Sequence, residues 1–308
     1  MGEDRTEETW AVTAIAREAP EVIQRFVAWH LDQGAAHIYL YFDDPGDPCI
    51  EMVSHLEQVS AVPCTPEFWT ELGLTQETRF TKRQNHACRH GYDQVSNGWV
   101  LNVDADELLW IETGSIGAFL AEQAPDCRAV LFEPAELVLI DGDEGQPAFR
   151  SKTPRPVLRR TYGDIANIIR RNDGLVGHNV GKSATRAGLK RFWLRQHYGQ
   201  LRSGEQITDR IVSPAEGAAI LHFFSRGYDD WRRKLDYRLT NRGFRPKMRR
   251  ALEAARDEGE DALRAIYAEL HYLSQDQAKS LQDGGCLNYY DLGITEKIAR
   301  YFPKAQMK

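Results

Sequence analysis

Asp104-Ala105-Asp106-Glu107 is the segment whose residue types point most directly to chemistry. It follows the apolar run Trp99–Val103, which opens after a turn-like Ser-Asn-Gly and predicts a buried strand. Residues i and i+2 of a strand point the same way, so we expect Asp104 and Asp106 to reach toward one point. Two carboxylates at a strand end suit a Mg²⁺ or Mn²⁺ ion that carries phosphates, although acidic turns are also common without a metal.

The residues before this segment predict alternating strands and helices. Trp10–Ala16 and His37–Phe42 have the composition of strands, and a helix that begins at Pro20 and is closed by Gly34 lies between them. Such a unit implies parallel strands, and ligands of parallel sheets bind beyond the carboxyl ends of the strands. We therefore expect one crevice lined by the polar residues at three strand ends, namely Arg17, Glu18, Asp43, Asp44, Asp104 and Asp106.

The second half of the chain gives weaker local signals. We expect a long loop over 141–156, a helix over Tyr228–Arg242 and one uninterrupted helix over 247–273. In the first of these helices, Trp231, Leu235 and Leu239 should form the buried stripe. The residues after 274 are expected to be helical and peripheral.

Composition limits the classes of function. The chain has 308 residues, 42% hydrophobic and 27% charged, as in ordinary soluble globular proteins, and its net charge of -6 argues against a nucleic-acid partner. Five scattered cysteines without a CxxC motif predict reduced thiols and a cytoplasmic location. No apolar run approaches the roughly 18 residues that a membrane span needs.

Positive charge is concentrated in one segment. Residues 232–250 contain nine Lys and Arg and one acid, Asp236. Such a segment is commonly a solvated helix face. The alternative is a surface that attracts an anionic acceptor, an acidic polymer or, peripherally, an anionic membrane.

Several motifs together resemble the family-2-like glycosyltransferases of the GT-A fold. The resemblance covers residues 9–245, and its most specific parts are Val100–Glu107 and Leu221–Lys234. Its other parts are Arg17-Glu18, His30–Gly34, Asp43-Asp44 and Gly181–Arg186. It implies an α/β fold over 9–245, with a GT-A-like (Rossmann-like), mixed but mostly parallel sheet flanked by helices, followed by a helical C-terminal extension over 246–308.

The resemblance also implies an activity and a site. The activity is metal-dependent transfer of a sugar from a nucleotide-diphosphate sugar to a carbohydrate or glycolipid acceptor, with Mn²⁺ or Mg²⁺ neutralising the departing nucleotide. Asp104, Asp106 and His222 would be the metal ligands. The donor would be held by Arg17, Glu18, Asp43, Asp44 and Asp104, with Lys82, Gln84 and Lys182 near its diphosphate. The family's usual Lys-Asn-Glu and Lys-Ser are here replaced by Arg17-Glu18 and Ser225-Arg226.

The catalytic base and two other functions stay open. An inverting transfer needs a carboxylate base, and Asp141, Asp143, Glu144 and Asp173 are candidates between which spacing does not choose. Whether the transfer inverts or retains the sugar's configuration also stays open. Asp104 and Asp106 would also suit a two-metal phosphoryl or nucleotidyl transferase. The third alternative is a non-catalytic carbohydrate-binding module on the same fold.

Overall fold

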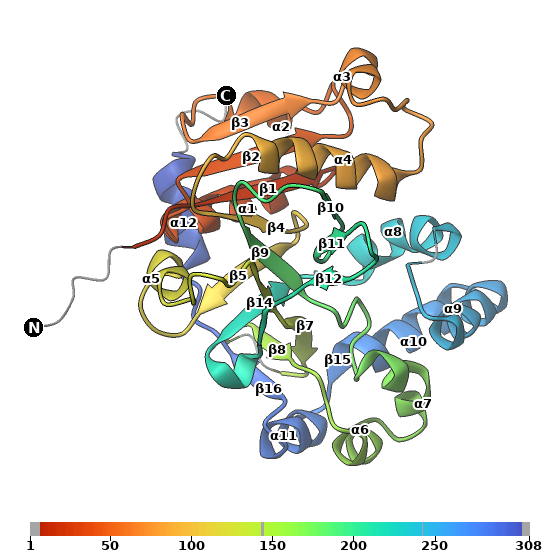
Figure 1. Cartoon of the computed structure of the whole chain (residues 1–308). Coiled ribbons are helices and arrows are strands. Elements are labelled where there is room, and N and C mark those ends of the chain that lie inside the picture. The colour runs from red at the N-terminus through yellow and green to blue at the C-terminus, as the bar shows by residue number, and fades with distance from the viewer. Residues whose placement is uncertain (1–6, 143–144, 242, 304–308) are drawn as a thin grey trace, which may run out of the picture. The chain divides into compact units, whose positions relative to one another are not determined.

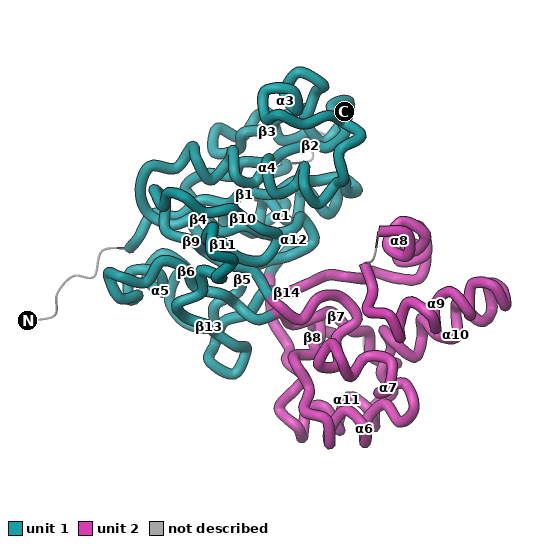
Figure 2. Tube along the Cα trace, turned by 45° about the vertical axis from the view of Figure 1, so that its right-hand side comes forward, with its two compact units in different colours: residues 1–133, 181–220, 293–308 teal, residues 134–180, 221–292 magenta. Residues whose placement is uncertain are grey.

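The computed structural model describes residues 7–142, 145–241 and 243–303. It is an α/β protein with mixed sheets flanked by helices (Figure 1). The chain forms two compact units, shown in Figure 2: unit 1 comprises Met1–Glu133, Gly181–Ile220 and Gly293–Lys308, and unit 2 comprises Pro134–Val180 and Leu221–Leu292. The chain thus divides at several places, whereas the sequence suggested one division between residues 245 and 246.

Unit 1 is built on a seven-stranded sheet of order β13-β6-β9-β4-β1-β2-β3. Strands β4, β1, β2 and β3 run parallel to one another, whereas β9 lies antiparallel between β4 and β6. The parallel strand-helix-strand unit predicted at the start of the chain is confirmed. The strands are β1 (Trp10–Ala16), β2 (His37–Phe42), β3 (Val59–Pro63), β4 (Trp99–Asn102), β6 (Ala129–Phe132), β9 (Lys182–Arg186) and β13 (Arg210–Val212).

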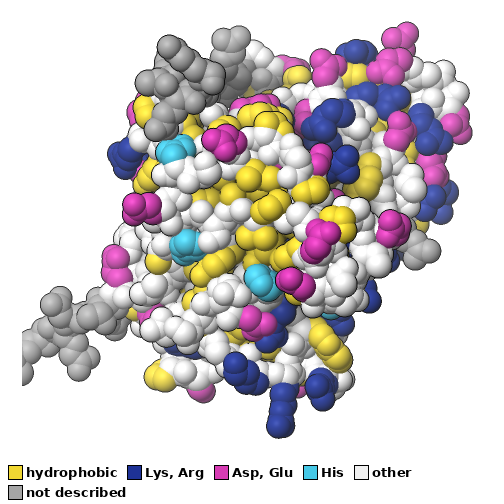
Figure 3. Space-filling model, turned by 90° about the horizontal axis from the view of Figure 1, so that it is seen from above, with side chains coloured by type: hydrophobic (Ala, Val, Ile, Leu, Met, Phe, Trp, Pro, Cys, Tyr) yellow, Lys and Arg dark blue, Asp and Glu magenta, His cyan; other side chains and the backbone are white. Residues whose placement is uncertain are grey.

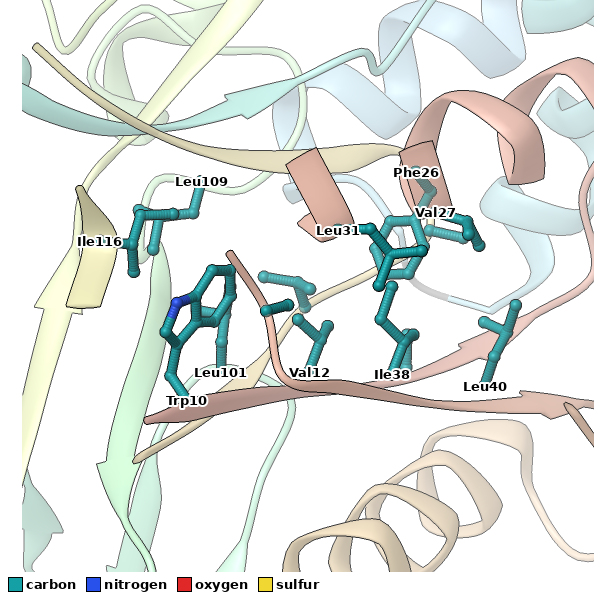
Figure 4. Packing of buried hydrophobic residues seen from close by; sticks show 14 of the residues in the cluster. Trp10, Val12, Phe26, Val27, Leu31, Ile38, Leu40, Leu101, Leu109 and Ile116 are labelled. Carbon is teal, nitrogen blue, oxygen red and sulfur yellow. The ribbon is translucent and has the colours of Figure 1, made fainter. Parts of the chain in front are cut away.

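Two helices cover opposite faces of the parallel strands. On one face, Val12 of β1 belongs to the same buried cluster as Phe26 and Val27 of α1 (Pro20–Asp32), as Figure 4 shows. On the other face, the Thr13 hydroxyl donates to the Cys88 carbonyl of α4 (Phe80–Asp93) at 3.3 Å. Alternate side chains of β1 therefore contact two different helices, because successive side chains of a strand point to opposite faces of the sheet.

The last helix of the chain also belongs to unit 1. In α12 (Ile294–Tyr301), Lys297 and Arg300 form ion pairs with Asp32 at the end of α1, and the following Phe302 is buried. None of the residues of α12 itself is buried, so this part of the tail is helical and peripheral, as expected. The other elements of unit 1 are α2 (Cys49–Val53), α3 (Pro66–Glu71), β5 (Glu107–Ile111), α5 (Ile116–Ala121), β10 (Phe192–Leu194), β11 (Gly199–Leu201), β12 (Gln206–Ile207) and the 3-10 turn Pro214–Glu216.

Unit 2 packs helices around a small sheet, in which β8 and β15 flank β7 and β16 follows β8. Trp231, Leu235 and Leu239 are buried in its core, as predicted. Strand β14 (Ala218–His222) carries the chain from unit 1 into unit 2. The elements of unit 2 are β7 (Pro134–Ile140), β8 (Ala148–Arg150), α6 (Arg155–Tyr162), α7 (Ala166–Ile169), α8 (Tyr228–Thr240), α9 (Pro246–Glu258), α10 (Glu260–His271), β15 (Tyr272–Leu273), α11 (Gln275–Asp283), β16 (Leu287–Tyr289) and the 3-10 turns Gly163–Ile165 and Arg170–Asn172.

Two expectations for this half of the chain are wrong. The predicted loop over 141–156 contains β8, whose three residues are buried against β7. The predicted single helix over 247–273 is two helices, because Gly259 between α9 and α10 has a φ of 129° that a helix cannot accommodate. Among the described residues, no helix has the length and apolar character that crossing a bilayer requires.

Candidate functional site

The predicted strand-end residues of unit 1 lie at one edge of its sheet. Strands β2 and β4 both pair with β1 in parallel, so their carboxyl ends face the same way. Arg17-Glu18 follow β1, Asp43-Asp44 follow β2, and Asp104 lies just after β4. The arrangement of the strands therefore brings these three segments to the same edge, as expected for a crevice beyond a parallel sheet.

The acidic segment itself is a turn and not the end of a strand. The Glu107 N–H donates to the Asp104 carbonyl at 3.0 Å, and the Glu107 carboxylate accepts the Asp104 N–H at 2.8 Å. The expectation that strand alternation aligns Asp104 with Asp106 is therefore wrong. Glu107 causes the difference, because its side chain folds back on the turn and its backbone starts β5 in a new direction.

Asp104 lies in a hydrogen-bonded network with a buried cation. Gln84 donates to its Oδ1 and Lys182 to its Oδ2, both at 2.6 Å, and the Lys182 ammonium lies 3.2 Å from Glu107. The side chains of Lys182 and Glu107 are 1% and 0% exposed, whereas that of Asp104 is 31% exposed. Burial alone would lower the pKa of Lys182, but Asp104 and Glu107 outweigh burial and raise that pKa above its ordinary value.

Gln196 completes this network and was not found from the sequence. Its side chain donates to Gln84 Oε1 at 2.8 Å, and its carbonyl accepts from Lys182 at 3.1 Å. The preceding carbonyl, of Arg195, accepts from Asn102 of β4 at 2.7 Å. Gln196 lies in the turn between β10 and β11, and no local pattern marks it, because its partners come from distant parts of the chain.

The two acidic residues that follow β2 are both paired with groups of the protein. Arg83 Nη2 lies 2.7 Å from both oxygens of Asp43, and the guanidinium lies 5.5 Å from the centroid of the Trp69 ring. Asp44 accepts the Gly46 N–H at 2.9 Å, which is the bond of an Asx turn. The carboxylate of Asp43 is therefore already paired with Arg83, while the predicted donor-binding residues Arg17 and Lys82 are exposed.

Unit 2 contains a pair of imidazoles. His222 ends β14, and its ring centroid lies 5.0 Å from that of His178. Imidazoles are common ligands of transition metals. The resemblance described above implied His222 as a metal ligand. Because Asp104 and Asp106 belong to unit 1 and His222 to unit 2, the predicted three-residue metal set stays a prediction.

A buried ion pair lies behind these histidines. Glu136 of β7 and Arg150 of β8 are direct cross-strand partners, and Arg150 Nη2 donates to Glu136 at 2.6 Å and Nη1 to the Tyr162 hydroxyl at 2.9 Å. Both side chains of the pair are at most 1% exposed. Burial would raise the pKa of Glu136, but Arg150 chiefly holds that pKa down at about 2.

Glu136 also fixes the backbone next to His178. Its carboxylate accepts the N–H groups of Val176, at 3.1 Å, and of Gly177, at 2.5 Å. A Cβ at Gly177 would lie 2.8 Å from His222 Cε1 and 3.0 Å from Glu136 Oε2, so no larger residue fits there without displacement. The charged pair, the glycine and the imidazoles thus form one tightly packed group within unit 2.

The structure does not choose between the four residues predicted as candidates for the catalytic base. Asp141 and Asp173 are exposed, and Asp173 accepts from the Asn179 amide at 2.8 Å. Asp143 and Glu144 lie outside the described residues. The choice of base therefore stays open.

Several basic residues of the segment 232–250 are paired with acids. Arg232 pairs with Asp236 and Glu260, both at 3.3 Å. Arg233 pairs with Asp230 at 2.9 Å, and Arg249 pairs with Glu253 at 2.8 Å. Arg242 lies outside the described residues. Basic and acidic side chains are likewise interspersed on the face of the molecule in Figure 3. Local pairing favours a solvated helix face, and the anionic-partner interpretation stays a prediction.

Comparison of the sequence with protein-family models finds none that matches, and comparison with curated proteins finds no significant similarity.

Proposed function

We propose that the protein is a metal-dependent glycosyltransferase with a GT-A-like fold, which transfers a sugar from a nucleotide-diphosphate sugar to a carbohydrate or glycolipid acceptor. The observation that carries the proposal is the acidic turn Asp104–Glu107 at the carboxyl edge of parallel strands, joined there by Gln84 and Lys182. Anionic nucleotides and their metals bind at such edges because side chains from several strand ends converge on them.

The donor set fits a nucleotide with a hard divalent cation. Gln84 and Lys182 hold the two oxygens of Asp104, and carboxylate oxygens are the hard donors that a ribose hydroxyl or a divalent cation takes. Asp106, half-buried in the same turn, offers a second carboxylate. Asp104 and Asp106 would hold Mn²⁺ or Mg²⁺, which would supply charge neutralisation for the departing diphosphate.

Lys182 gives the chain a fixed positive charge in this network. Its ammonium is anchored by Asp104, Glu107 and the Gln196 carbonyl. It orients the Asp104 carboxylate, and with Gln84 it restricts that side chain to one position before any ligand binds. Preorganised groups of this kind reduce the ordering that a bound donor has to impose.

The same contacts give less support to a two-metal phosphoryl or nucleotidyl transferase. A two-metal cage needs several carboxylates that can turn toward the ions. Glu107, the third acid of the segment, is fully buried and bonded to Lys182 and to the Asp104 N–H. A non-catalytic carbohydrate-binding module would use the same edge of the sheet. Only a measurement of turnover distinguishes such a module from a glycosyltransferase.

Calorimetric titration with UDP and with GDP, each with and without Mn²⁺, tests the proposal. We expect one nucleotide to bind only with metal present, and Asp106→Asn to weaken this binding by at least about tenfold, since it removes a charged ligand. Asp93→Asn is the matched control, because Asp93 is an exposed acid paired with Arg89 on α4. Absence of metal-dependent binding of either nucleotide would refute the proposal. Binding without release of nucleotide from any donor sugar would assign the non-catalytic function.

A further inference from the structure

The small sheet of unit 1, β10-β11-β12, has one apolar and one polar face. Phe192 and Leu194 of β10 and Ile207 of β12 are buried in a cluster with Tyr92 of α4. Trp193, between the two buried residues of β10, points to the opposite face and is 47% exposed. This indole lies outside the apolar cluster on the other face of the small sheet.

The polar face surrounds this indole with hydrogen-bonding groups. Gln200 of β11 is the cross-strand partner of Trp193, and Gln206 of β12 is the partner of Gln200, so all three side chains lie on one face. The Arg195 guanidinium lies 5.4 Å from the indole centroid, and its Nε donates to Gln200 Oε1 at 2.9 Å. This surface consists of one aromatic plane, two amides and one guanidinium.

The face is directly connected to the Asp104 network. Trp193 and Gln196 are three residues apart, which is about 10 Å along an extended chain. Gln196 bonds Gln84 and Lys182, and the Arg195 carbonyl accepts from Asn102 at the end of β4. The strand that carries Trp193 thus leads into the turn that contacts Gln84 and Lys182 of the proposed donor site.

We propose that this polar face of β10-β11-β12, centred on Trp193, is a saccharide-binding subsite for the acceptor. This assignment rests on the proposed function. An indole stacks on the C–H face of a sugar ring, while amides and a guanidinium hydrogen-bond its hydroxyls. One large apolar side chain among polar groups offers too little apolar area for a stable interface with another protein.

Binding to a panel of immobilised oligosaccharides, of neutral hexoses, N-acetylhexosamines and uronic acids, tests the subsite without requiring turnover. We expect the protein to bind at least one class, and Trp193→Ala to weaken that binding by about tenfold or more. Metal-dependent nucleotide binding and thermal unfolding should be unchanged, because Trp193 contacts neither the core nor Asp104 in the described network. Tyr237→Ala is the matched control, since Tyr237 is an aromatic residue of α8 that is 55% exposed.

The outcomes separate this inference from the proposed function. Equal saccharide binding by the protein and Trp193→Ala, an equal loss in Tyr237→Ala, or no binding to any member of the panel would overturn the subsite, whatever the nucleotide titration shows. Vesicle binding that requires Trp193, without saccharide binding, would assign the indole to a membrane surface and would also overturn it. Saccharide binding that requires Trp193, without any nucleotide binding, would retain the subsite and refute the glycosyltransferase.

Discussion

Replacing Arg150 by Met should destabilise unit 2 by about 3 kcal/mol at neutral pH. The structure shows Glu136 fully buried, with a pKa lowered from 4.5 to about 2, chiefly by Arg150 against the opposing effect of burial. A difference of that size corresponds to roughly 3 kcal/mol of stability. It agrees with the roughly 3–5 kcal/mol that is lost when one partner of a buried ion pair is removed.

The pH dependence follows from the sign of this shift. Glu136 is a stronger acid in the folded protein than in the unfolded chain, so its contribution to stability is present above pH 4.5 and is lost as the pH falls toward about 2. The difference between the protein and Arg150→Met should therefore be largest near neutral pH. It should decrease as the pH falls, because burial without Arg150 raises the pKa of the carboxyl and lets it take up a proton in the variant, while the paired Glu136 loses its contribution below pH 4.5.

Urea unfolding at pH 7, together with hydrogen exchange of the amides of β7 and β8, measures the effect in unit 2. Arg159→Met is the control, because Arg159 is exposed on the neighbouring α6. The double variant Arg150→Met with Glu136→Gln should regain a large part of the loss, since no unpaired charge is then buried. A loss no greater than the control's, or a double variant no more stable than Arg150→Met, would refute the reasoning.

Three further predictions concern packing, thiols and acid sensitivity. Gly177→Ala should cost roughly 1–3 kcal/mol of stability in urea unfolding, because its Cβ would lie 2.8 Å from His222 Cε1; unchanged stability would show that the imidazole moves freely. All five cysteines are buried, and burial raises the pKa of Cys49 and of Cys88 to about 12, so an aromatic disulfide reagent should titrate five thiols only in denaturant. Burial lowers the pKa of His30 to about 4 and of His271 to about 3, from 6.5 in both cases. The unfolded chain therefore takes up protons first, and the urea midpoint of unfolding should fall as the pH decreases from 6.5 toward 4. His271→Phe should reduce this fall, and an equal fall in that variant would contradict the assignment.

Elements with strong local signals were predictable from the sequence. The bounds of β1 and β2 and the helix from Pro20 are confirmed, because apolar periodicity, a proline at the helix start and Gly34 at its end all agree. The division of the last long helical stretch was missed, although Gly259 marks it. A lone glycine is tolerated in many helices, so its φ was not evident from the sequence alone.

The candidate site was predictable by residue type but not by contact. Asp104, Gln84 and Lys182 were each expected near the donor, and the structure places them in one network. Their bonds to each other, and the part played by Gln196, depend on pairings between distant segments that periodicity does not reveal. Glu136 could have been noticed as an acid within an apolar strand, but its partner Arg150 lies in a segment expected to be a loop.

The position of α12 on α1 has a consequence for how the chain folds during synthesis. Lys297 and Asp32 are 265 residues apart in sequence, and Asp32 belongs to a helix that emerges from the ribosome long before α12. The cover of α1 is therefore completed only after all of unit 2 has been translated, because α12 follows it. Contacts between such distant segments slow folding and prolong the exposure of apolar surface. Neither unit corresponds to a single uninterrupted stretch of the chain, so a deletion that removes either one must rejoin the chain at new points.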